Sequence, residues 1–386
     1  MTQRPLAPAS LAAQGLGWIE PTTKAIVSPI HVSSTFLRDE DNQFRSGRVY
    51  SRADNPTFDQ VEATVTALEH GVAGLVFASG MAAATACFQS LEPGHHVIAP
   101  TVMYWALRNW LATFATRWGL SVSFIDTTDL AAVASAVQPG RTKLIWLETP
   151  ANPLWHVSDI EAVAAIAHRA GARLAIDSTV AAAVFTRPLD LGADVVMHSA
   201  TKYLNGHSDL VAGMLVTARY DDFWQRIKTI RAQIGGVLGS FEAWLLMRGL
   251  RTLFPRVRWS AQSAQCLADR LAAHPAVVEV LYPGLPNCIG HEVARRQMHG
   301  GFGAMLSIRI RGGESAAIAT AARVELWKRA TSLGGVESLI EHRSSIEGSG
   351  SPCPPDLLRL SVGIEESDDL FADLDQALVA AHANGI

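Results

Sequence analysis

Short apolar runs alternate with helical patterns through the middle of the chain. Runs of this length, bounded by turn residues, are typical of buried strands, whereas apolar residues that recur every three or four positions indicate helices. The strand-like runs cover residues 74–77, 97–99, 122–125, 144–147, 174–176 and 195–197. Because strands that alternate with helices form parallel pairs, residues 56–240 are predicted to form an α/β domain with a mostly parallel sheet.

The two ends of the chain show other patterns. Residues 1–55 contain scattered prolines and turn-forming residues, which predicts an extended arm. Residues 241–386 mix helical and strand-like segments, which predicts a smaller α+β domain. In that domain we expect helices over residues 241–251, 260–274 and 367–381, and strands over residues 305–309 and 358–362.

Composition narrows the class of protein. A chain of 386 residues with 48% hydrophobic and 18% charged residues is expected to fold, and to do so as more than one unit. The formal net charge is −4 and no basic tract is present, so no nucleic-acid partner is expected. No apolar run is long enough to span a bilayer, and the first residues lack the apolar core of a secretion signal. The four cysteines are widely spaced and suit neither a zinc site nor a disulfide framework, so we expect a cytoplasmic protein without a bound metal.

Ligands of open α/β sheets bind beyond the carboxyl ends of the strands, so the polar residues that follow the strand-like runs are candidates for chemistry. Lys202 is one of only five lysines and follows the run 195–197. In an apolar setting the pKa of its ammonium falls, and the amine can attack a carbonyl. The alternative is an exposed lysine whose charge extends into solvent.

Other residues near the strand ends suit an anionic ring ligand. Asp177 ends a strand, where a buried carboxylate needs a cation such as a protonated pyridine nitrogen; the alternative is an N-cap of the next helix. Gly80 opens a helix after a strand, where backbone amides can approach a phosphate; the alternative is an ordinary turn. Ser199 and Thr201 could add hydroxyl donors to that phosphate, or they could be solvated loop residues.

Two arginines are further candidates. Arg52 lies with Tyr50 on the arm and could bind a phosphate through its forked donors, although a surface arginine is the more common case. Arg359 lies within an apolar strand and needs an anion there, either an amino-acid carboxylate or a structural partner. His207 and Asp209 resemble half of a metal site, but no third ligand has suitable spacing, so we expect a structural role for them.

The order of these motifs resembles the Cys/Met-metabolism family of pyridoxal phosphate (PLP) enzymes, which includes cystathionine γ-synthase, cystathionine β- and γ-lyases and methionine γ-lyase. The resemblance runs from about Ala25 to Leu378 and is strongest at residues 199–209, SATKYLNGHSD. Further matching segments are residues 27–30, 33–36, 50–52, 55–57, 79–83, 148–153, 332–339 and 358–363.

The resemblance implies a fold of the aspartate-aminotransferase type and a homotetramer built from two active dimers. It implies that Lys202 holds PLP as a Schiff base and acts in catalysis, and that Asp177 pairs with the pyridinium nitrogen. Tyr104 on the ring and Tyr50 from a neighbouring subunit are the other implied catalytic residues. The remaining implied site residues are Gly80, Met81, Ser199 and Thr201 on the phosphate, Arg52 beside Tyr50 in the neighbouring subunit's site, and Asn152, Ser332 and Arg359 at the substrate.

Several positions depart from the family pattern near the expected substrate side chain. Ser178 stands where Asn is usual, Trp105 where Gly is common, Thr331 where several γ-lyases have Glu, and Arg343 where Pro is usual. We expect Arg343 to lie at the site entrance and to bind a distal carboxylate, as in cystathionine, and Trp105 to narrow the same space. The alternative is a surface ion pair of Arg343 with Glu341 or Glu347, which would contribute little.

The predicted reaction is elimination of a β- or γ-substituent from a sulfur-type amino acid, which yields a 2-oxo acid and ammonia. The nearest alternative is γ-replacement, as in cystathionine γ-synthase or O-acylhomoserine sulfhydrylase, and an aminotransferase is a weaker one. From other classes, a PLP-free Schiff-base aldolase and a non-catalytic binding protein also remain as alternatives.

Overall fold

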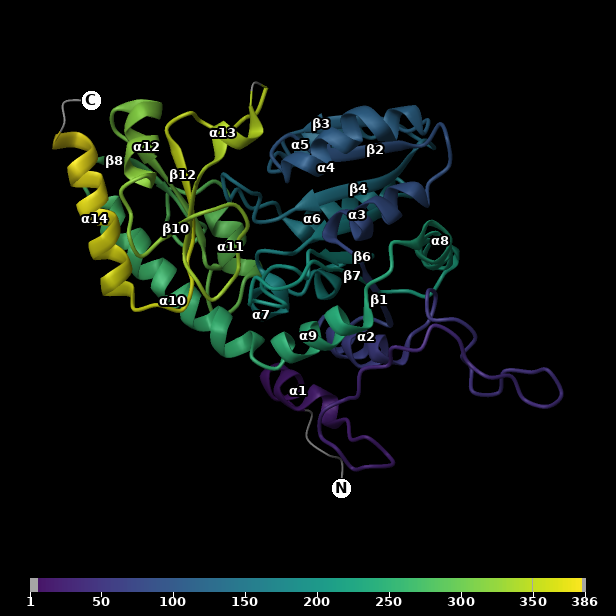
Figure 1. Cartoon of the computed structure of the whole chain (residues 1–386). Helices are drawn as coiled ribbons and strands as arrows, with labels where there is room; N and C mark the ends of the chain where they lie inside the picture. Colours follow the sequence, from purple (N-terminus) through teal and green to yellow (C-terminus); the bar gives the residue numbers. More distant parts are fainter. Residues whose placement is uncertain (1–5, 349, 384–386) are drawn as a thin grey trace.

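Two β-sheets with their surrounding helices make up most of the molecule in the computed structural model, which describes residues 6–348 and 350–383 (Figure 1). The helices are α1 (Pro8–Gln14), α2 (Pro56–Leu68), α3 (Gly80–Gln89), α4 (Trp105–Trp110), α5 (Leu130–Ala136), α6 (Ile160–Arg169), α7 (Ala182–Phe185), α8 (Asp222–Ile230), α9 (Ser240–Leu250), α10 (Leu253–Ala272), α11 (His291–Gln297), α12 (Gly313–Ala321), α13 (Arg343–Glu347) and α14 (Ser367–Ala383). The strands are β1 (Ala73–Phe77), β2 (His96–Pro100), β3 (Ser121–Ile125), β4 (Thr142–Glu148), β5 (Arg173–Asp177), β6 (Val195–His198), β7 (Gly213–Thr217), β8 (Val277–Leu281), β9 (Met305–Ile310), β10 (Lys328–Arg329), β11 (Leu339–His342) and β12 (Leu357–Ser361).

The larger sheet has the strand order β1-β7-β6-β5-β4-β2-β3. The pairs from β6 to β3 are parallel, whereas β7 runs antiparallel to both β1 and β6. All the strand-like runs of the sequence form strands, and the mostly parallel sheet is confirmed. Neither β7 nor its antiparallel direction was predicted, and the direction could not have been, because strands buried on both faces have the same apolar composition whichever way they run.

The smaller sheet has the order β10-β11-β12-β9-β8, and its strands are antiparallel except for the short pair β10 and β11. The predicted strands over residues 305–309 and 358–362 correspond to β9 and β12. The sequence did not predict β8, β10 or β11. Helix α10 packs on β8 and β9 and also contacts α7, so it connects the two parts of the molecule.

The arm is less irregular than the sequence indicated. Pro8 begins the short helix α1, and Gly15 ends it with a φ of +54°, a conformation that favours glycine. The helix is attached to the body, since Arg251 Nε donates to the Ala13 carbonyl oxygen (3.0 Å). A later loop of the arm projects away from the helices of the body (Figure 1).

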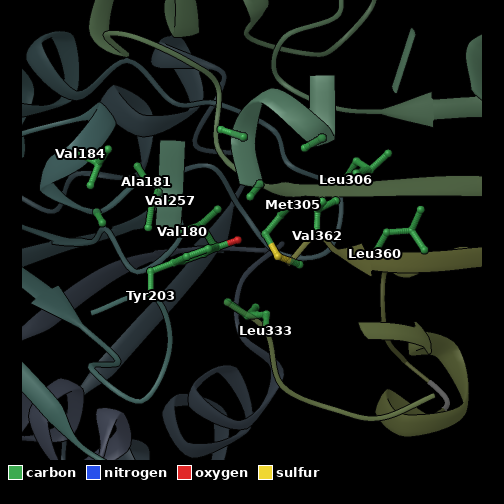
Figure 2. Close-up of a cluster of buried hydrophobic side chains, with 14 of the residues drawn as sticks. Val180, Ala181, Val184, Tyr203, Val257, Met305, Leu306, Leu333, Leu360 and Val362 are labelled. Carbon is green, nitrogen blue, oxygen red and sulfur yellow. The ribbon is translucent and has the colours of Figure 1, made fainter. Parts of the chain in front are cut away.

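One apolar cluster joins the two parts of the molecule behind the segment that carries Lys202. Figure 2 shows Tyr203 from that segment among side chains that come from both sheets or from the helices on them. Others in the cluster are Val180, Ala181, Val184, Val257, Met305, Leu306, Leu333, Leu360 and Val362. Because all these side chains are buried together, the two sheets have a fixed relative position.

Arg256 of α10 holds the same segment by polar contacts. Its guanidinium donates to the carbonyl oxygens of Tyr203 (3.2 Å) and Gly249 (2.9 Å). Its hydrogen-bond acceptors are carbonyl oxygens and the Thr252 hydroxyl, and burial lowers the pKa of Arg256 to about 10. Gly206 has a φ of +74°, and a Cβ added there would lie 1.7 Å from Arg256 Nη1. The Lys202 segment therefore requires glycine at position 206.

Gly206→Ala is expected to lower the free energy of unfolding by about 2–4 kcal/mol, because it adds a steric clash with Arg256 to the backbone strain. Gly140→Ala is the matched control, since Gly140 has a φ of +73° and nothing within 4 Å of the added Cβ. That variant should lose only about 1–2 kcal/mol. Urea unfolding of both variants measures the difference, and equal losses would show that the Arg256 contact is unimportant.

Candidate active site

A cavity of about 240 Å³ lies at the carboxyl ends of the parallel strands and is closed by residues of the smaller sheet. It brings together nearly all of the residues that the sequence singled out. These are Gly80, Met81, Tyr104, Asn152, Asp177, Ser199, Thr201, Lys202, Ser332, Arg343 and Arg359. Convergence of these side chains from segments so far apart in the chain identifies the cavity as the candidate active site.

One end of the cavity suits a phosphate. Helix α3 begins at Gly80, and the preceding Ser79 accepts a hydrogen bond from the Ala82 amide (3.0 Å). A Cβ at Gly80 would lie 2.8 Å from Ser199 Oγ, so glycine allows the two segments to approach closely. The Thr201 hydroxyl donates to the Ala212 carbonyl oxygen (3.2 Å), so a phosphate contact by Thr201 would have to replace that bond. Helix amides and the Ser199 hydroxyl remain the simpler donors.

Asp177 lies at the end of β5 and is buried. Its Oδ1 accepts hydrogen bonds from the Thr179 amide (3.0 Å) and the Thr179 hydroxyl (2.5 Å). The next helix begins only at Ala182, so the alternative of a helix N-cap is wrong. Burial raises the pKa of Asp177 although Thr179 opposes the shift. A cation in the cavity would stabilise the carboxylate.

Lys202 and Ser332 meet across the two domains. Lys202 Nζ donates to Ser332 Oγ (2.6 Å). Burial, and next the charge of Arg359, lower the pKa of Lys202 to about 8, so the exposed-lysine alternative is wrong. Ser332 has a φ of +89°, which costs a non-glycine residue about 1–3 kcal/mol and is most often found at functional sites.

The guanidinium of Arg359, on β12, donates hydrogen bonds to three protein groups. Its Nη2 donates to the Ser332 carbonyl oxygen (2.8 Å) and to Glu341 Oε2 (2.6 Å), and its Nη1 donates to Asn152 Oδ1 (3.3 Å). Burial lowers the pKa of Arg359 to about 10. The sequence offered Arg359 either a structural partner or a substrate carboxylate. The structure is compatible with both, because Arg359 pairs with Glu341 and also lines the cavity.

The surroundings of Arg343 match neither role expected from the sequence, which were a site for a distal carboxylate and a surface ion pair. It is only 4% exposed, so a surface ion pair is wrong, yet it does pair with Glu341 (2.7 Å) and Glu347 (2.7 Å). Because its guanidinium already binds two carboxylates, a distal substrate carboxylate would have to compete with them. Trp105 does not line the cavity, and its ring instead lies 5.2 Å from the guanidinium of Arg108. The prediction that Trp105 narrows the substrate space is therefore wrong.

Three glutamates of the site were not expected at the cavity: Glu148 had no role, and Glu341 and Glu347 were considered only as surface partners of Arg343. Glu148 accepts hydrogen bonds from the amides of Tyr104 (2.7 Å) and Asn152 (2.9 Å), so it joins the loops that carry these residues. Burial, and next the nearby Asp177, raise the pKa of Glu148 to about 8. Glu341 stands opposite Arg359 in the β11–β12 register, and Glu347 binds Arg343. Only the position of Glu148 after a strand could have indicated its role from the sequence.

Tyr50 and Arg52 lie outside the cavity of their own chain. Tyr50 is half exposed on the arm, and the Arg52 guanidinium lies 5.9 Å from its ring centroid. His207 and Asp209 both bond to Asn205, which confirms the expected structural role. Among residues 6–348 and 350–383 no group of three His, Cys, Asp or Glu side chains could hold a metal ion. No helix in this part of the chain is long and apolar enough to cross a membrane.

These residues fit PLP. Lys202, an amine of lowered pKa, would hold the cofactor aldehyde, the buried carboxylate of Asp177 would pair with the pyridinium nitrogen, and the Gly80 turn would allow a close approach of the phosphate. The fold and the site define a PLP-dependent enzyme of the aspartate-aminotransferase fold type.

The chain belongs to the Cys/Met-metabolism family of PLP-dependent enzymes, whose model matches residues 14–379. It is 45% identical to cystathionine gamma-synthase of Mycobacterium tuberculosis over 365 residues, which is 93% of either chain. It is 41% identical to cystathionine gamma-lyase of Bacillus subtilis, over 92% of this chain and 95% of the relative. The crystal structure of cystathionine gamma synthase from Xanthomonas oryzae in complex with cystathionine is similar, with a TM-score of 0.93, 35% identity and coverage of 98% of this chain and 100% of the other.

The protein is thus a PLP-dependent trans-sulfuration enzyme that acts on an amino acid. The alternatives of a PLP-free aldolase and of a non-catalytic binding protein are wrong, and an aminotransferase gains no support from the relatives. The names of the relatives are compatible with both elimination and γ-replacement.

The cofactor-free protein should capture PLP faster as the pH rises through about 8, because Lys202 attacks as the neutral amine and its pKa is about 8. Growth of the cofactor absorbance measures the rate. After borohydride reduction, peptide mapping should find the label on Lys202. Lys143→Ala should behave like the parent protein, and Lys202→Ala should take no covalent label. A rate independent of pH, or a label on another lysine, would contradict the assignment.

Proposed function

We propose that the protein is a carbon–sulfur lyase that eliminates a β- or γ-substituent from an amino acid such as cystathionine. One observation supports this most strongly: Lys202 Nζ and Arg359 Nη2 both donate to Ser332, at 2.6 and 2.8 Å. A base for the Cα proton and an anchor for the α-carboxylate are thereby held at a fixed separation. That arrangement suits chemistry that begins by removing the Cα proton.

Each residue has a part in such an elimination. Arg359, held by Asn152, binds the α-carboxylate of the substrate. Lys202 Nζ takes the Cα proton, and the Ser332 hydroxyl keeps the amine in position. Asp177 balances the proton on the pyridine nitrogen, so that bound PLP supplies an electron sink for charge at Cα. The substituent leaves as a thiol, and water then releases a 2-oxo acid and ammonia.

A second candidate is γ-replacement, in which a thiol takes the place of the leaving group and no 2-oxo acid forms. The 45% identity to a relative named cystathionine gamma-synthase favours it. Thr331, which lines the cavity, also supports it, because a threonine offers no charge to the distal ammonium of cystathionine.

Product analysis distinguishes the two candidates. With cystathionine alone, a lyase should release 2-oxo acid and ammonia in equal amounts, and Lys202→Ala should release neither. Arg359→Leu should raise KM at least tenfold, because a charge-assisted bond to the carboxylate is lost. If an O-acylhomoserine with cysteine gives cystathionine while cystathionine alone gives no 2-oxo acid, the replacement reaction is the correct one.

We also propose that the protein is a cytoplasmic homo-oligomer, in the form of a tetramer of two active dimers. The exposed apolar side chains of the arm support this, since Val32 is 84% and Leu37 is 93% exposed. In the dimer the arm would bring Tyr50 and Arg52 to the phosphate end of the neighbouring cavity. Four free cysteines among the described residues suit a reducing compartment.

If the sites are shared, inactive Arg52→Ala and inactive Lys202→Ala chains should restore activity when refolded together. A mixed dimer has one site with both residues intact, so up to half of the sites in mixed dimers should work. Arg38→Ala is the matched control for an exposed arginine of the arm and should remain active alone. Mixed oligomers that form without activity would show that the arm serves its own subunit.

A further inference from the structure

Four charged side chains form a buried series of ion pairs at the smaller-domain side of the cavity. In spatial order they are Arg359, Glu341, Arg343 and Glu347, and each is less than a tenth exposed. The three contacts measure 2.6, 2.7 and 2.7 Å. Arg343 and Arg359 also line the cavity, so this charge cluster is part of the wall that a substrate meets.

Glu341 is shared by the two arginines. Its Oε2 accepts from Arg359 Nη2 and from Arg343 Nη1. The rest of the Arg343 guanidinium is bound by Glu347 Oε1, which accepts from Nε (3.1 Å) and Nη2 (2.7 Å). Helix α13 makes this pair possible, because residues four apart lie on the same face of a helix. Ser351 donates to the other oxygen of Glu347.

The fixed charge around Arg359 decides how strongly it attracts a further anion. In the parent cluster two arginines face two glutamates, so the formal sum is zero, and Glu341 divides its attraction between two cations. Without Arg343, one arginine would face two glutamates and the sum would be −1. Without the charge of Glu347 the sum would be +1. Because the cluster is buried, such charges are weakly screened and act over several ångströms.

We propose that Arg343 is a positioning residue that sets the affinity of Arg359 for the substrate α-carboxylate. Arg343 holds Glu341 in place and reduces its neutralising effect on Arg359, while Glu347 balances the charge that Arg343 adds. The inference rests on the proposed function, in which Arg359 binds the carboxylate. It differs from the expectation that Arg343 binds a distal carboxylate, because the guanidinium is already held by Glu341 and Glu347.

Substrate specificity distinguishes the two possible roles of Arg343. If Arg343 acts through Arg359, its replacement changes the binding of every α-amino acid by a similar factor, whatever the side chain. If Arg343 instead binds a distal carboxylate, its replacement weakens the binding of cystathionine selectively and leaves the binding of glycine unchanged. Glycine has no side chain that could reach Arg343, so it is a clean probe of the Arg359 end.

The experiment measures the dissociation constant of glycine from the PLP-loaded enzyme by the change in cofactor absorbance, with thermal unfolding recorded in parallel. Arg343→Met should weaken binding about tenfold, which corresponds to one buried charge at this range. Glu347→Gln should strengthen it, and the double variant should return close to the parent value. Arg309→Met is the matched control, since Arg309 is on the same sheet and pairs with Asp356 outside the cavity.

The outcomes separate this inference from the proposed function. If Arg359→Leu does not weaken glycine binding, the carboxylate assignment of the proposed function is wrong. If Arg359→Leu does weaken it, but Arg343→Met and Glu347→Gln both weaken it and the double variant gives no recovery, the cluster is structural and the inference is overturned. Selective loss of cystathionine binding in Arg343→Met also overturns it. If Arg343→Met does not fold, Glu347→Gln alone tests the role of Arg343. Its affinity for glycine must then be higher than that of the parent enzyme, and an unchanged or lower affinity overturns the inference.

Discussion

The contact between Lys202 and Ser332 holds the site together. Lys202 comes from the segment after β6 and Ser332 from the smaller domain, and the 2.6 Å bond between them spans the cavity. The same Ser332 supports Arg359 through its carbonyl oxygen, in a strained backbone conformation with a φ of +89°. The apolar cluster around Tyr203 and the cage of carbonyl oxygens on Arg256 keep the two sides in place. Catalytic geometry here thus depends on how the domains pack.

Charge compensation is the second constraint on the cavity. Lysine, arginine and carboxylate side chains are buried in one space, where an unpaired charge would be costly. The arginines are paired with Glu341 and Glu347, whereas Asp177 and Lys202 keep shifted pKa values that suit a bound cofactor. Glu148 has a raised pKa of about 8 and joins the loops of Tyr104 and Asn152. The charges of the two arginines are therefore compensated by protein groups, whereas Asp177 and Lys202 are available to a bound cofactor.

Local patterns were sufficient for the elements of the larger sheet and for most of the site. Six short apolar runs became β1 to β6, because burial on both faces leaves a continuous apolar signature. Residues at the ends of these strands, such as Asp177 and Lys202, could be placed since parallel strands end at one edge. The resemblance to a family added Ser332 and Asn152. The strands β7 and β11 were not predicted, and neither was β10, whose two residues are too few to show a periodic signal.

The sequence by itself determined the fold class, the family and the choice of Lys202 as the candidate lysine, because these depend on the kind of residue at each strand end and on the order of motifs. Only the tertiary structure decided which groups Arg343 pairs with and how deeply it is buried. Arg343 is close in sequence to Glu341 and Glu347, which could have formed a solvated ion pair. The β11–β12 register instead places Glu341 against Arg359, and packing buries the whole cluster beside the cavity. The ion-pair partners and the burial of Arg343 depend on contacts between segments that are distant in the sequence, and local periodicity does not predict such contacts.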